Sequence, residues 1–394
     1  MREVYLLSAA RTAVGTFAGT LASIPSPKLG SIVIAEALRR AKVEPAWVDE
    51  VIMGCVLQAA LGQGPARQAA MEAGIPETVP AWTLNNICGS GLKSVAVASA
   101  MIKAGDCECL VVGGMENMSR APYAANFVRE AHKMGNMEMI DTMLSDGLVD
   151  AFSKLHMGFT AEAVAEKYGL SRRDLDEFAA NSQQKAGRAL ENGAFAEEIV
   201  PVTVPQRKGD PIEFKVDEHP RPNTTVEILA KLRPSFKPDG LVTAGNASGL
   251  NDGAAAMVVA SEDFVKEHNL TPWARLVATG STALDPMYMG LGPIEATRLA
   301  LRRAGWTVDD LDLAELNEAF AAQSVAVLRD LQINPDIVNV NGGAIALGHP
   351  VGASGARILT TLLYGLKHRG GKRGLATLCV GGGMGVAALV EIVG

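Results

Sequence analysis

Apolar residues along the chain fall into two patterns, short continuous runs and longer stretches with helical spacing. Runs at 4–7, 51–54 and 110–114 predict buried strands, while the spacing at 29–41 and 92–102 predicts helices with one apolar side. Because buried strands alternate with helices, the pattern predicts a layered α/β protein. We expect a mostly parallel sheet that is covered on both faces.

The pattern changes between 120 and 245, where Met, Pro and charged residues become more frequent and buried strands fewer. Within this region, Ser171 is typical of an N-cap and predicts an amphipathic helix that runs to 187. Residues 210–238 are polar and rich in Pro, and they predict an irregular segment. We therefore interpret the region as an insertion into the α/β pattern.

From 270 onward the first pattern recurs, in short matches that keep the same order. The matched segments are 38–41 with 301–304, 48–51 with 308–311, 89–91 with 353–355, and 113–115 with 382–384. Four ordered matches indicate a duplication that forms two similar α/β halves. We expect residues 1–119 and 246–269 to form the first half, 120–245 an inserted loop domain, and 270–394 the second half.

Composition narrows the class of protein. The 394 residues are 48% hydrophobic and include 41 glycines, which suits closely packed helices on buried strands. A net charge of −7 argues against a nucleic-acid partner. The five cysteines contain no CxxC pair, so we expect no metal site and no disulfide framework. Reduced thiols, no signal peptide and no apolar stretch long enough for a bilayer predict a cytoplasmic protein without a membrane partner.

One cysteine stands at a predicted helix start. Cys88 lies directly before Gly89-Ser90-Gly91, and the apolar helix pattern follows. Free N–H groups and the positive end of a helix dipole lower the pKa of a nearby thiol. A fall from roughly 8.5 to about 7 would make half of the thiol ionised at pH 7. Cys88 is therefore a candidate nucleophile, although most free cysteines only pack in a core.

Three stretches of the second half carry further candidate chemistry. Asn317 follows a strand-like run, His349 lies in the glycine-rich segment 341–352, and Cys379 ends a buried strand before a run of glycines. Each has an ordinary alternative, because Asn caps helices, a loop His can be satisfied locally and a Cys can pack in a core. Only their combination points to one chemistry.

Together these stretches resemble the active-site motifs of the thiolase family, and the resemblance covers essentially the whole chain. The matching motifs are 85–91, 317–320, 348–350 and 379–385, in the family's order and spacing. His156-Met157-Gly158 and the Met-rich segment 134–143 are similar to the short-chain acetyl-CoA acetyltransferases of that family. The resemblance implies a five-layer α-β-α-β-α fold, a homotetramer joined partly through the inserted loops, and a role in fatty acid metabolism.

The resemblance also implies a role for each catalytic residue. Cys88 takes the acyl group as a thioester, and His349 accepts its proton and returns it to the departing coenzyme A. Cys379, as a thiolate, removes a proton from the methyl group of the second acetyl-CoA. The backbone N–H groups of Cys88 and Gly381 would form one oxyanion site. His349 and a water held by Asn317 would form the other.

Coenzyme A and acyl-CoA are the expected small-molecule partners, as substrates, and no separate cofactor is expected. By resemblance, Arg221 lies near the nucleotide phosphates. Nine further residues would line the pantetheine tunnel: Leu148, His156, Met157, Phe236, Ala244, Ser248, Met289, Ala319 and Phe320.

Three alternatives remain open. A thiolase for longer 3-ketoacyl-CoA chains shares every catalytic residue, although Met157 and Met289 would crowd a long chain. A ketoacyl or hydroxymethylglutaryl synthase of the same fold lacks a base of the Cys379 type. A non-catalytic acyl-CoA or dinucleotide-binding module would need a helix after its glycine-rich loop, whereas 386–393 is strand-like.

Overall fold

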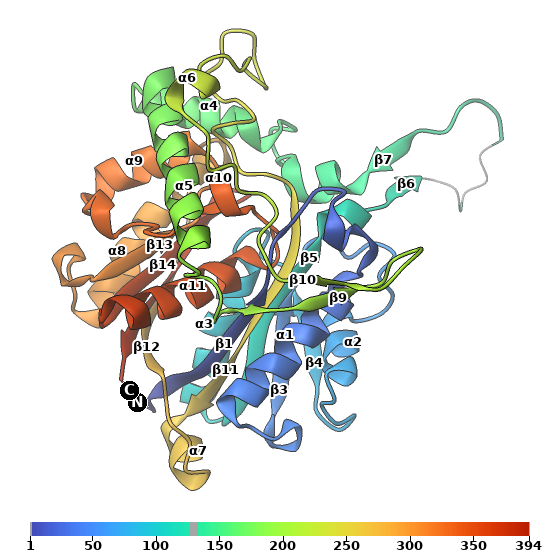
Figure 1. The fold of residues 1–394 in the computed structure, drawn as a ribbon, viewed down its shortest axis with the longest axis vertical. Coiled ribbons are helices and arrows are strands. Elements are labelled where there is room, and N and C mark those ends of the chain that lie inside the picture. Colours follow the sequence, from blue (N-terminus) through green and yellow to red (C-terminus); the bar gives the residue numbers. More distant parts are fainter. Residues whose placement is uncertain (1, 126–128, 130–132, 394) are drawn as a thin grey trace.

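The computed structural model describes residues 2–125, 129 and 133–393. In the first half, five strands pair in the order β1-β11-β5-β3-β4, and three helices pack on them (Figure 1). The strands are β1 (Val4–Thr12), β3 (Glu50–Gly54), β4 (Ala81–Leu84), β5 (Cys109–Asn117) and β11 (Asn251–Ser261). The helices are α1 (Ser26–Ala41), α2 (Pro65–Glu72) and α3 (Ser90–Ala104).

The second half repeats this order as β12-β15-β14-β13. Its strands are β12 (Ala274–Ala283), β13 (Leu313–Leu316), β14 (Arg373–Val380) and β15 (Met384–Ile392). Its helices are α8 (Gly292–Ala304), α9 (Ala321–Leu331), α10 (Ala344–Leu347) and α11 (Ser354–Arg369). The two sheets meet edge to edge where β1 pairs with β12, through Tyr5 with Arg275 and Leu6 with Ala274.

The helices and sheets form the five layers that the resemblance implies. Helices α3 and α11 share one apolar core with residues from both sheets, so they form the middle layer. Helices α1 and α2 pack with the outer side of the first sheet, and α8 and α9 pack with the outer side of the second. The middle layer is therefore buried from both sides, and the residues at the starts of α3 and α11 are brought together there.

The expectation of a mostly parallel sheet is wrong. Strand β11 runs antiparallel to β1 and β5, and β15 runs antiparallel to β12 and β14. Parallel pairs are formed by β3 with β4 and β5, and by β13 with β14. Continuous apolar runs report that both faces of a strand are buried, and they carry no information about the direction of its neighbour. The sheet is mixed.

Two of the four sequence matches correspond in the structure, and two do not. Segments 38–41 and 301–304 end α1 and α8, and segments 89–91 and 353–355 begin α3 and α11. Asp49 accepts hydrogen bonds from the backbone N–H groups of Glu108 and Cys109, where β5 begins. Asp312 accepts the same pair of bonds from Lys372 and Arg373, where β14 begins. Asp49 therefore corresponds to Asp312 and not to Asp309. Residues 113–115 lie within β5, whereas Gly382 and Gly383 form the turn after β14.

The inserted region packs against both halves. It contains α4 (Met157–Lys167), α5 (Arg172–Glu191), the short α6 (Val226–Leu229) and a π-helix at Leu144–Leu148. Ser171 and Asp174 form a capping box at the start of α5, as the sequence predicts. Strands β6 (Tyr123–Ala125) and β7 (Met139–Asp141) form an arm that projects from the body (Figure 1). Residues 126–128 and 130–132 of the inserted region lie outside the described part of the chain, and the three-part domain division stays a prediction.

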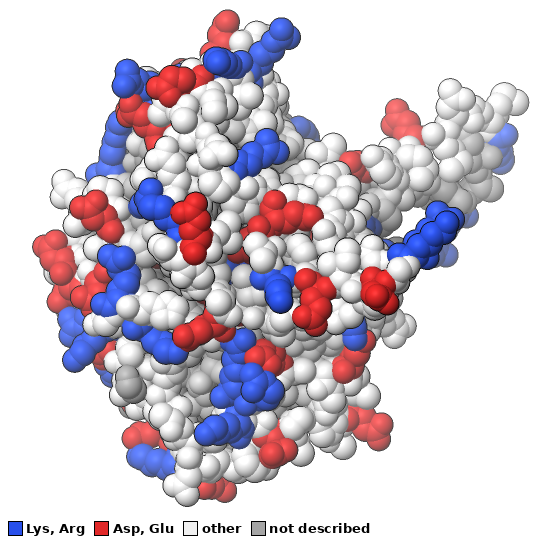
Figure 2. Space-filling view, viewed as in Figure 1, with Lys and Arg blue, Asp and Glu red and all other residues white. Residues whose placement is uncertain are grey.

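Shorter elements connect these parts. They are β2 (Gly15–Thr16), β8 (Ile199–Val200), β9 (Val202–Val204), β10 (Ile212–Phe214), α7 (Glu262–Glu267) and 3₁₀ turns at Thr20–Ser23, Pro45–Trp47, Met118–Arg120, Pro286–Leu291, Val308–Asp310 and Pro335–Ile337. Segment 210–238, expected to be irregular, contains only β10 and α6 as regular elements in the described structure. On the face in Figure 2, acidic and basic side chains are interspersed.

One segment is apolar enough to meet the length and hydropathy criteria for a membrane span, contrary to the sequence-based expectation. Ile87–Ala104 has 18 residues with a mean hydropathy of 1.2, which is enough by length and composition alone for a membrane span. In the structure half of this segment is buried, and α3 packs between β3, β5 and α11. A core helix meets the same criterion, so its apolar character is explained by the middle layer.

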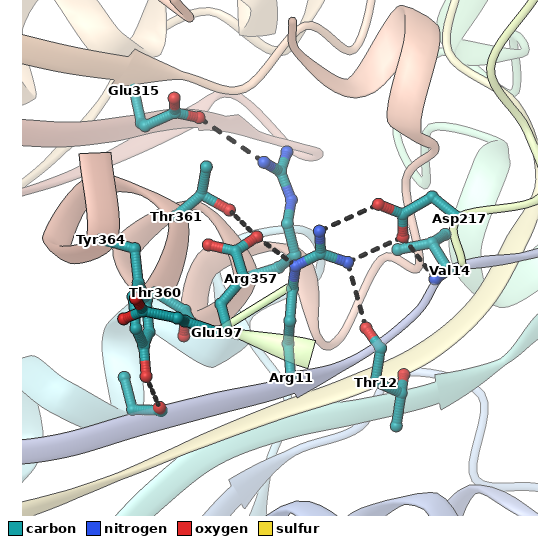
Figure 3. A network of polar contacts seen from close by, with 12 residues as sticks. Arg11, Thr12, Val14, Glu197, Asp217, Glu315, Arg357, Thr360, Thr361 and Tyr364 are labelled. Carbon is teal, nitrogen blue, oxygen red and sulfur yellow. Dashed lines mark hydrogen bonds and ion pairs between the residues drawn. The ribbon is translucent and has the colours of Figure 1, made fainter. Parts of the chain in front are cut away.

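A buried ion network joins the first half, the inserted region and the second half (Figure 3). Arg11 of β1 binds Asp217 through two nitrogens, at 2.7 and 2.9 Å, and binds Glu198 through Nε at 2.5 Å. Arg357 of α11 lies 3.5 Å from Glu315 of β13. All five side chains are buried, so losing a partner of Arg11 would leave an uncompensated charge away from water.

Candidate active site

Cys88 lies in a tight turn between β4 and α3. Asn85 Oδ1 accepts a hydrogen bond from the backbone N–H of Ile87 at 3.0 Å, and Ile87 has a φ of 45°. Ser90 Oγ accepts from the backbone N–H of Asn86 at 2.8 Å and donates to the carbonyl of Ile87 at 2.6 Å. These side-chain bonds fix the turn that carries Cys88, which is half-buried.

The environment of Cys88 reverses the expected direction of its pKa. Burial raises the pKa of the thiol to about 11, although the backbone N–H groups of Gly381 and of Cys88 itself lower it. The negative charge of Glu116 raises it further. The helix-start effect is therefore outweighed by burial, and the resting residue is a thiol. Cys88 needs a base before it can attack a carbonyl.

His349 is held from two sides in the turn before α11. Its backbone N–H donates to Asn251 Oδ1 at 2.9 Å, and its Nδ1 lies 2.6 Å from Ser354 Oγ. Ser354 Oγ also lies 2.9 Å from the carbonyl of Pro350, and when its single proton points there, Nδ1 of His349 carries the proton of the His349–Ser354 bond. The other ring nitrogen, Nε2, then presents a lone pair.

The free nitrogen of His349 is available to a reacting group. Nε2 is buried and has no hydrogen-bond partner among the residues that the structure describes. Burial, together with the charge of Arg357, lowers the pKa of His349 to about 3, so the ring is neutral at pH 7. A neutral imidazole with an unpaired lone pair can accept a proton, and because burial makes it a weak base, it holds that proton only while a negative charge lies beside it.

Cys379 is the second thiol of the site and, unlike Cys88, it is fully buried. It is the penultimate residue of β14 and only 1% exposed. Burial raises its pKa well above the usual range, and the nearby Cys88 raises it further, so both sulfur atoms lie close enough for their charges to interact. Gly382 and Gly383 follow with φ values of 79°, a conformation that favours glycine, and turn the chain into β15.

These residues meet at one cavity of about 100 Å³. The predicted residues that line it are Cys88, Leu148, His156, Met157, Phe236, Ser248, Met289, Ala319, Phe320, His349, Cys379 and Gly381. They come from both halves and from the inserted region, so the cavity exists only when all three are assembled. No covalent bond links them, since all five cysteines of the chain, each within the described residues, are free.

An aromatic group forms one wall of the cavity. The His156 ring stacks on Phe236 with centroids 4.8 Å apart, and Phe320 meets Phe236 edge-on at 6.5 Å. His156 Nδ1 accepts from the backbone N–H of Gly158 at 3.1 Å, which caps α4 and fixes the ring. A Cβ placed on Gly158 would lie 2.2 Å from the Phe236 ring, so this wall packs directly on the helix backbone.

Three predicted residues do not line the cavity. Asn317 is fully buried beside the motif that supplies Ala319 and Phe320, and both atoms of its amide lack a partner in the described part of the chain. Ala244 and Arg221 are exposed. The backbone N–H of Arg221 donates to Gln183 at 2.7 Å. The cavity is short, so a nucleotide end of coenzyme A would lie outside it.

Sequence reasoning missed several residues of the site. The cavity is also lined by Ile87, Met118, Gly147, Ala247, Gly249, Leu250 and Val351. Ile87 lies next to Cys88 and Val351 lies near His349, so closeness in sequence to a predicted motif residue could have identified both. Asn251 and Ser354, which hold His349, gave weaker signals. Ser354 belongs to a segment that the duplication marked, whereas Asn251 opens an ordinary apolar strand.

Comparisons with known proteins agree over the whole chain. Residues 4–263 match the model of the thiolase N-terminal domain, and residues 270–392 match that of the thiolase C-terminal domain. The acetyl-CoA acetyltransferase of Cupriavidus necator is 56% identical over 391 residues, covering 99% of this chain and 100% of that protein. The acetyl-CoA acetyltransferase of Pseudomonas aeruginosa is 56% identical over 387 residues, covering 98% of each.

Solved structures show the same relationship. The crystal structure of the Bacillus anthracis acetyl-CoA acetyltransferase has a TM-score of 0.97 and 44% identity, covering 100% of this chain and 99% of that one. The human mitochondrial 3-ketoacyl-CoA thiolase in complex with CoA has a TM-score of 0.96 and 43% identity, covering 100% and 98%. The chain belongs to the thiolase family and is an acyltransferase enzyme.

Proposed function

We propose that this enzyme is an acetyl-CoA C-acetyltransferase, which condenses two acetyl-CoA molecules to acetoacetyl-CoA and coenzyme A, and also catalyses the reverse thiolysis. The observation that carries the proposal is that Cys88, His349 and Cys379 line one small cavity. A nucleophile, a neutral imidazole and a second thiol suit acyl transfer to sulfur followed by proton abstraction beside a carbonyl. The names of relatives at 56% identity support acetyl-CoA as substrate.

The first half-reaction forms acetyl-Cys88. His349 Nε2 accepts the proton of the Cys88 thiol, and the sulfur attacks the carbonyl carbon of acetyl-CoA. Collapse of the tetrahedral intermediate breaks the bond to the coenzyme A sulfur, which leaves as a thiolate. The backbone N–H groups of Gly381 and Cys88, which already interact with the Cys88 sulfur, are placed to donate to the oxygen of the acetyl group.

Proton balance over the two half-reactions indicates which group protonates the departing coenzyme A. Cys379 is a thiol at rest because burial raises its pKa, so it must lose its proton before it acts as a base. Donation of that proton to the coenzyme A thiolate achieves this within the first half-reaction. In this proposal the Cys88 proton stays on His349 until the second half-reaction, in place of its return to coenzyme A.

The second half-reaction forms the carbon–carbon bond. The Cys379 thiolate removes a proton from the methyl group of a second acetyl-CoA, and the enolate carbon attacks the acetyl carbonyl on Cys88. The Cys88 sulfur leaves and takes back the proton from His349. During this step, protonated His349 Nε2 and a water held by the unpaired Asn317 amide stabilise the enolate oxygen.

The size of the cavity supports a short acyl chain. Its volume is about 100 Å³, and the buried side chains of Met157, Met289 and Phe320 close it. The fold alone does not discriminate, because a 3-ketoacyl-CoA thiolase has nearly the same TM-score as an acetyl-CoA acetyltransferase. We therefore compare thiolysis of acetoacetyl-CoA with thiolysis of a ten-carbon 3-ketoacyl-CoA. A much higher kcat/KM for acetoacetyl-CoA is expected, and comparable values would reject the short-chain assignment.

The role of Cys379 has its own test. We expect the variant Cys379→Ala to form acetyl-Cys88 and to lose deuterium exchange into the methyl group of acetyl-CoA. Mass spectrometry of the protein and NMR of the substrate measure the two steps separately. Wild-type exchange by this variant would remove Cys379 as the base.

The projecting arm supports assembly into a homotetramer. Tyr123, Met134, Met137 and Met139 are 62%, 91%, 48% and 58% exposed, and large apolar side chains on a projecting hairpin are typical of an interface. Light scattering of the purified enzyme tests this part of the proposal. A monomer or dimer at micromolar concentration would contradict it.

A further inference from the structure

Glu116 is a buried carboxylate that the proposed reaction does not use. It lies on β5 and is 0% exposed. Its Oε2 accepts hydrogen bonds from the backbone N–H groups of Val56 at 3.0 Å and Gly352 at 2.9 Å. Its Oε1 accepts from the backbone N–H of Leu57 at 3.1 Å and from the Cys55 thiol at 3.7 Å. One side chain therefore binds two separate loops.

Both loops border the reactive residues. Gly352 lies in the turn between His349 and α11, directly after Val351, which lines the cavity. Val56 and Leu57 follow β3 and belong to the apolar cluster that contains Val351, with Ile87 and Cys88 packed against it. A change in the distance between the two loops would move His349 and Val351 relative to Cys88.

The turn that contains Gly352 packs tightly around Glu116. A Cβ placed on Gly352 would lie 2.7 Å from Glu116 Oε2. The carbonyl oxygen of Gly352 lies 2.0 Å from the position that a Cβ of Gly114 would take, and 2.7 Å from that of Gly54. The turn is thus pressed onto β3 and β5, and the carboxylate fills the space at the centre of this contact.

We propose that Glu116 is a positioning residue for the thiolase reaction. Its carboxylate ties the turn after His349 to the loop after β3, and so holds His349 and Val351 against Cys88. The proposal rests on the proposed function, in which Cys88 transfers its proton to His349. Glu116 itself contacts neither of these side chains in a hydrogen bond, so it acts through the backbone of Gly352, Val56 and Leu57.

The charge of Glu116 provides a second readout. Burial raises the pKa of Glu116 to about 7, and the three backbone N–H groups and the Cys55 thiol oppose this rise. When ionised, Glu116 raises the pKa of Cys88. Cys55 and Cys88 are the titratable groups that the described structure couples to it. A neutral side chain at this position would therefore make the Cys88 thiol easier to ionise.

Two variants separate position from charge. Glu116→Gln keeps the shape, but whichever way its amide turns, the NH₂ group faces at least one backbone N–H that the carboxylate now accepts. Glu116→Asp keeps the charge and is too short to reach both loops. The control is Asp312→Asn, because Asp312 also accepts two backbone N–H bonds, at 2.7 and 2.9 Å, at the exposed start of β14. It lies outside the cavity lining.

We expect both Glu116 variants to lose about ten- to a hundredfold in kcat for acetoacetyl-CoA thiolysis, the cost of a displacement near 1 Å at the reacting groups. KM should change much less than kcat, because the displaced His349 acts on the chemical step and only Val351 of the cavity lining moves with it. The amides of Gly352, Val56 and Leu57 should exchange with deuterium faster than in the wild type. Glu116→Gln should also speed alkylation of Cys88 by iodoacetamide at pH 8, while Glu116→Asp should not. Asp312→Asn should match the wild type in all four.

Wild-type kcat in both variants, or unchanged exchange of the Gly352 amide, would overturn the proposal. If Glu116→Gln does not fold, Glu116→Asp carries the test, since it keeps the charge and removes only one methylene group. Amide exchange and alkylation do not depend on turnover. A wild type without thiolysis would therefore reject the proposed function, while these two measurements would still decide the role of Glu116.

Discussion

Helices α3 and α11 lie side by side in the middle layer, and both begin with a serine whose hydroxyl donates to a carbonyl in the preceding turn. Ser90 donates to Ile87 at 2.6 Å, and Ser354 donates to Pro350 at 2.9 Å. The remaining bond differs, because Ser90 accepts from the backbone of Asn86 and Ser354 binds the ring of His349. The same serine-to-carbonyl hydrogen bond thus supports the turn of the nucleophile in the first half and the turn of the base in the second.

The same comparison extends along the strands. Asp49 and Asp312 bind the first N–H groups of β5 and β14, which aligns Cys109 with Arg373. Counting along both strands from this point makes Met115 of the first half equivalent to Cys379 of the second, and Glu116 equivalent to Val380. The duplicated halves have therefore diverged at these positions. The first half supplies Cys88 and Glu116, the second supplies His349 and Cys379, and neither half holds a complete site.

The largest effect should come from the position where the two turns differ most. Cys88 lies two residues before Ser90, and the second half has Gly352 at the matching place. Cys88→Ala should lower acetyl transfer by about 10⁴-fold or more, because removal of a nucleophile abolishes the covalent route. Trapping of labelled acetyl-CoA on the protein measures it. Cys107→Ala serves as control, and labelling of Cys88→Ala at the wild-type level would contradict the assignment.

Replacing each serine tests whether the two turns do different work. Ser354→Ala should lower kcat about ten- to a hundredfold, because His349 loses the partner that sets its tautomer, with KM nearly unchanged. Ser90→Ala should cost about 1–2 kcal/mol of stability, since it leaves the N–H of Asn86 unpaired, and should lower kcat less. Steady-state kinetics and urea unfolding of both variants provide the comparison. Equal kcat losses would show that the two serines do not differ in role.

The glycines after the serines should behave alike in both halves. A Cβ on Gly91 would lie 2.6 Å from the backbone of Ala356, and one on Gly355 would lie 2.3 Å from the backbone of Leu92. Gly91→Ala and Gly355→Ala should each lower the free energy of unfolding by about 1–3 kcal/mol through overpacking. Gly365→Ala is the control, because its Cβ meets only the end of the Leu313 side chain. A clear difference between the first two variants would break the symmetry of the helix contact.

The smallest effect concerns the buried charges beside α11. Burial raises the pKa of Glu315 to about 8, although Arg357 opposes this. A raised pKa means that the folded state holds a proton that the unfolded state has lost, so stability falls as pH rises from 4.5 to about 8. Glu315→Gln should reduce this fall by about 1.4 kcal/mol or more, the free energy of one pKa unit. Urea unfolding at pH 5 and pH 8 measures it, and an unchanged slope would contradict it.

Local patterns predicted the elements of the fold well. The spacing at 29–41 and 92–102 predicted α1 and α3, and Ser171 predicted the capped start of α5. They did not predict strand direction, because an alternating or continuous apolar run describes the faces of a strand and not its partner. They also misaligned two of the internal matches, since short segments repeat by chance and only the Asp49 and Asp312 contacts showed the true register.

The motifs identified most residues of the site, but they did not identify the protonation states of those residues or the contacts that hold them. Twelve of the predicted residues line one cavity, while Asn317, Arg221 and Ala244 do not. The predicted fall in the pKa of Cys88 was wrong, because a helix start is visible in the sequence and the extent of burial is not. Ser354 and Asn251, which hold His349, became evident only from their contacts.

By itself the sequence determined which reactive groups the protein carries, where helices start and that the chain is duplicated, because these depend on residue type and local spacing. Only the tertiary structure decided that the two halves share one middle layer and that Cys88, His349 and Cys379 face one cavity. It also decided that the thiols are protonated at rest and that Glu116 joins two loops. Burial and contacts between distant segments set these properties, and no local pattern encodes them.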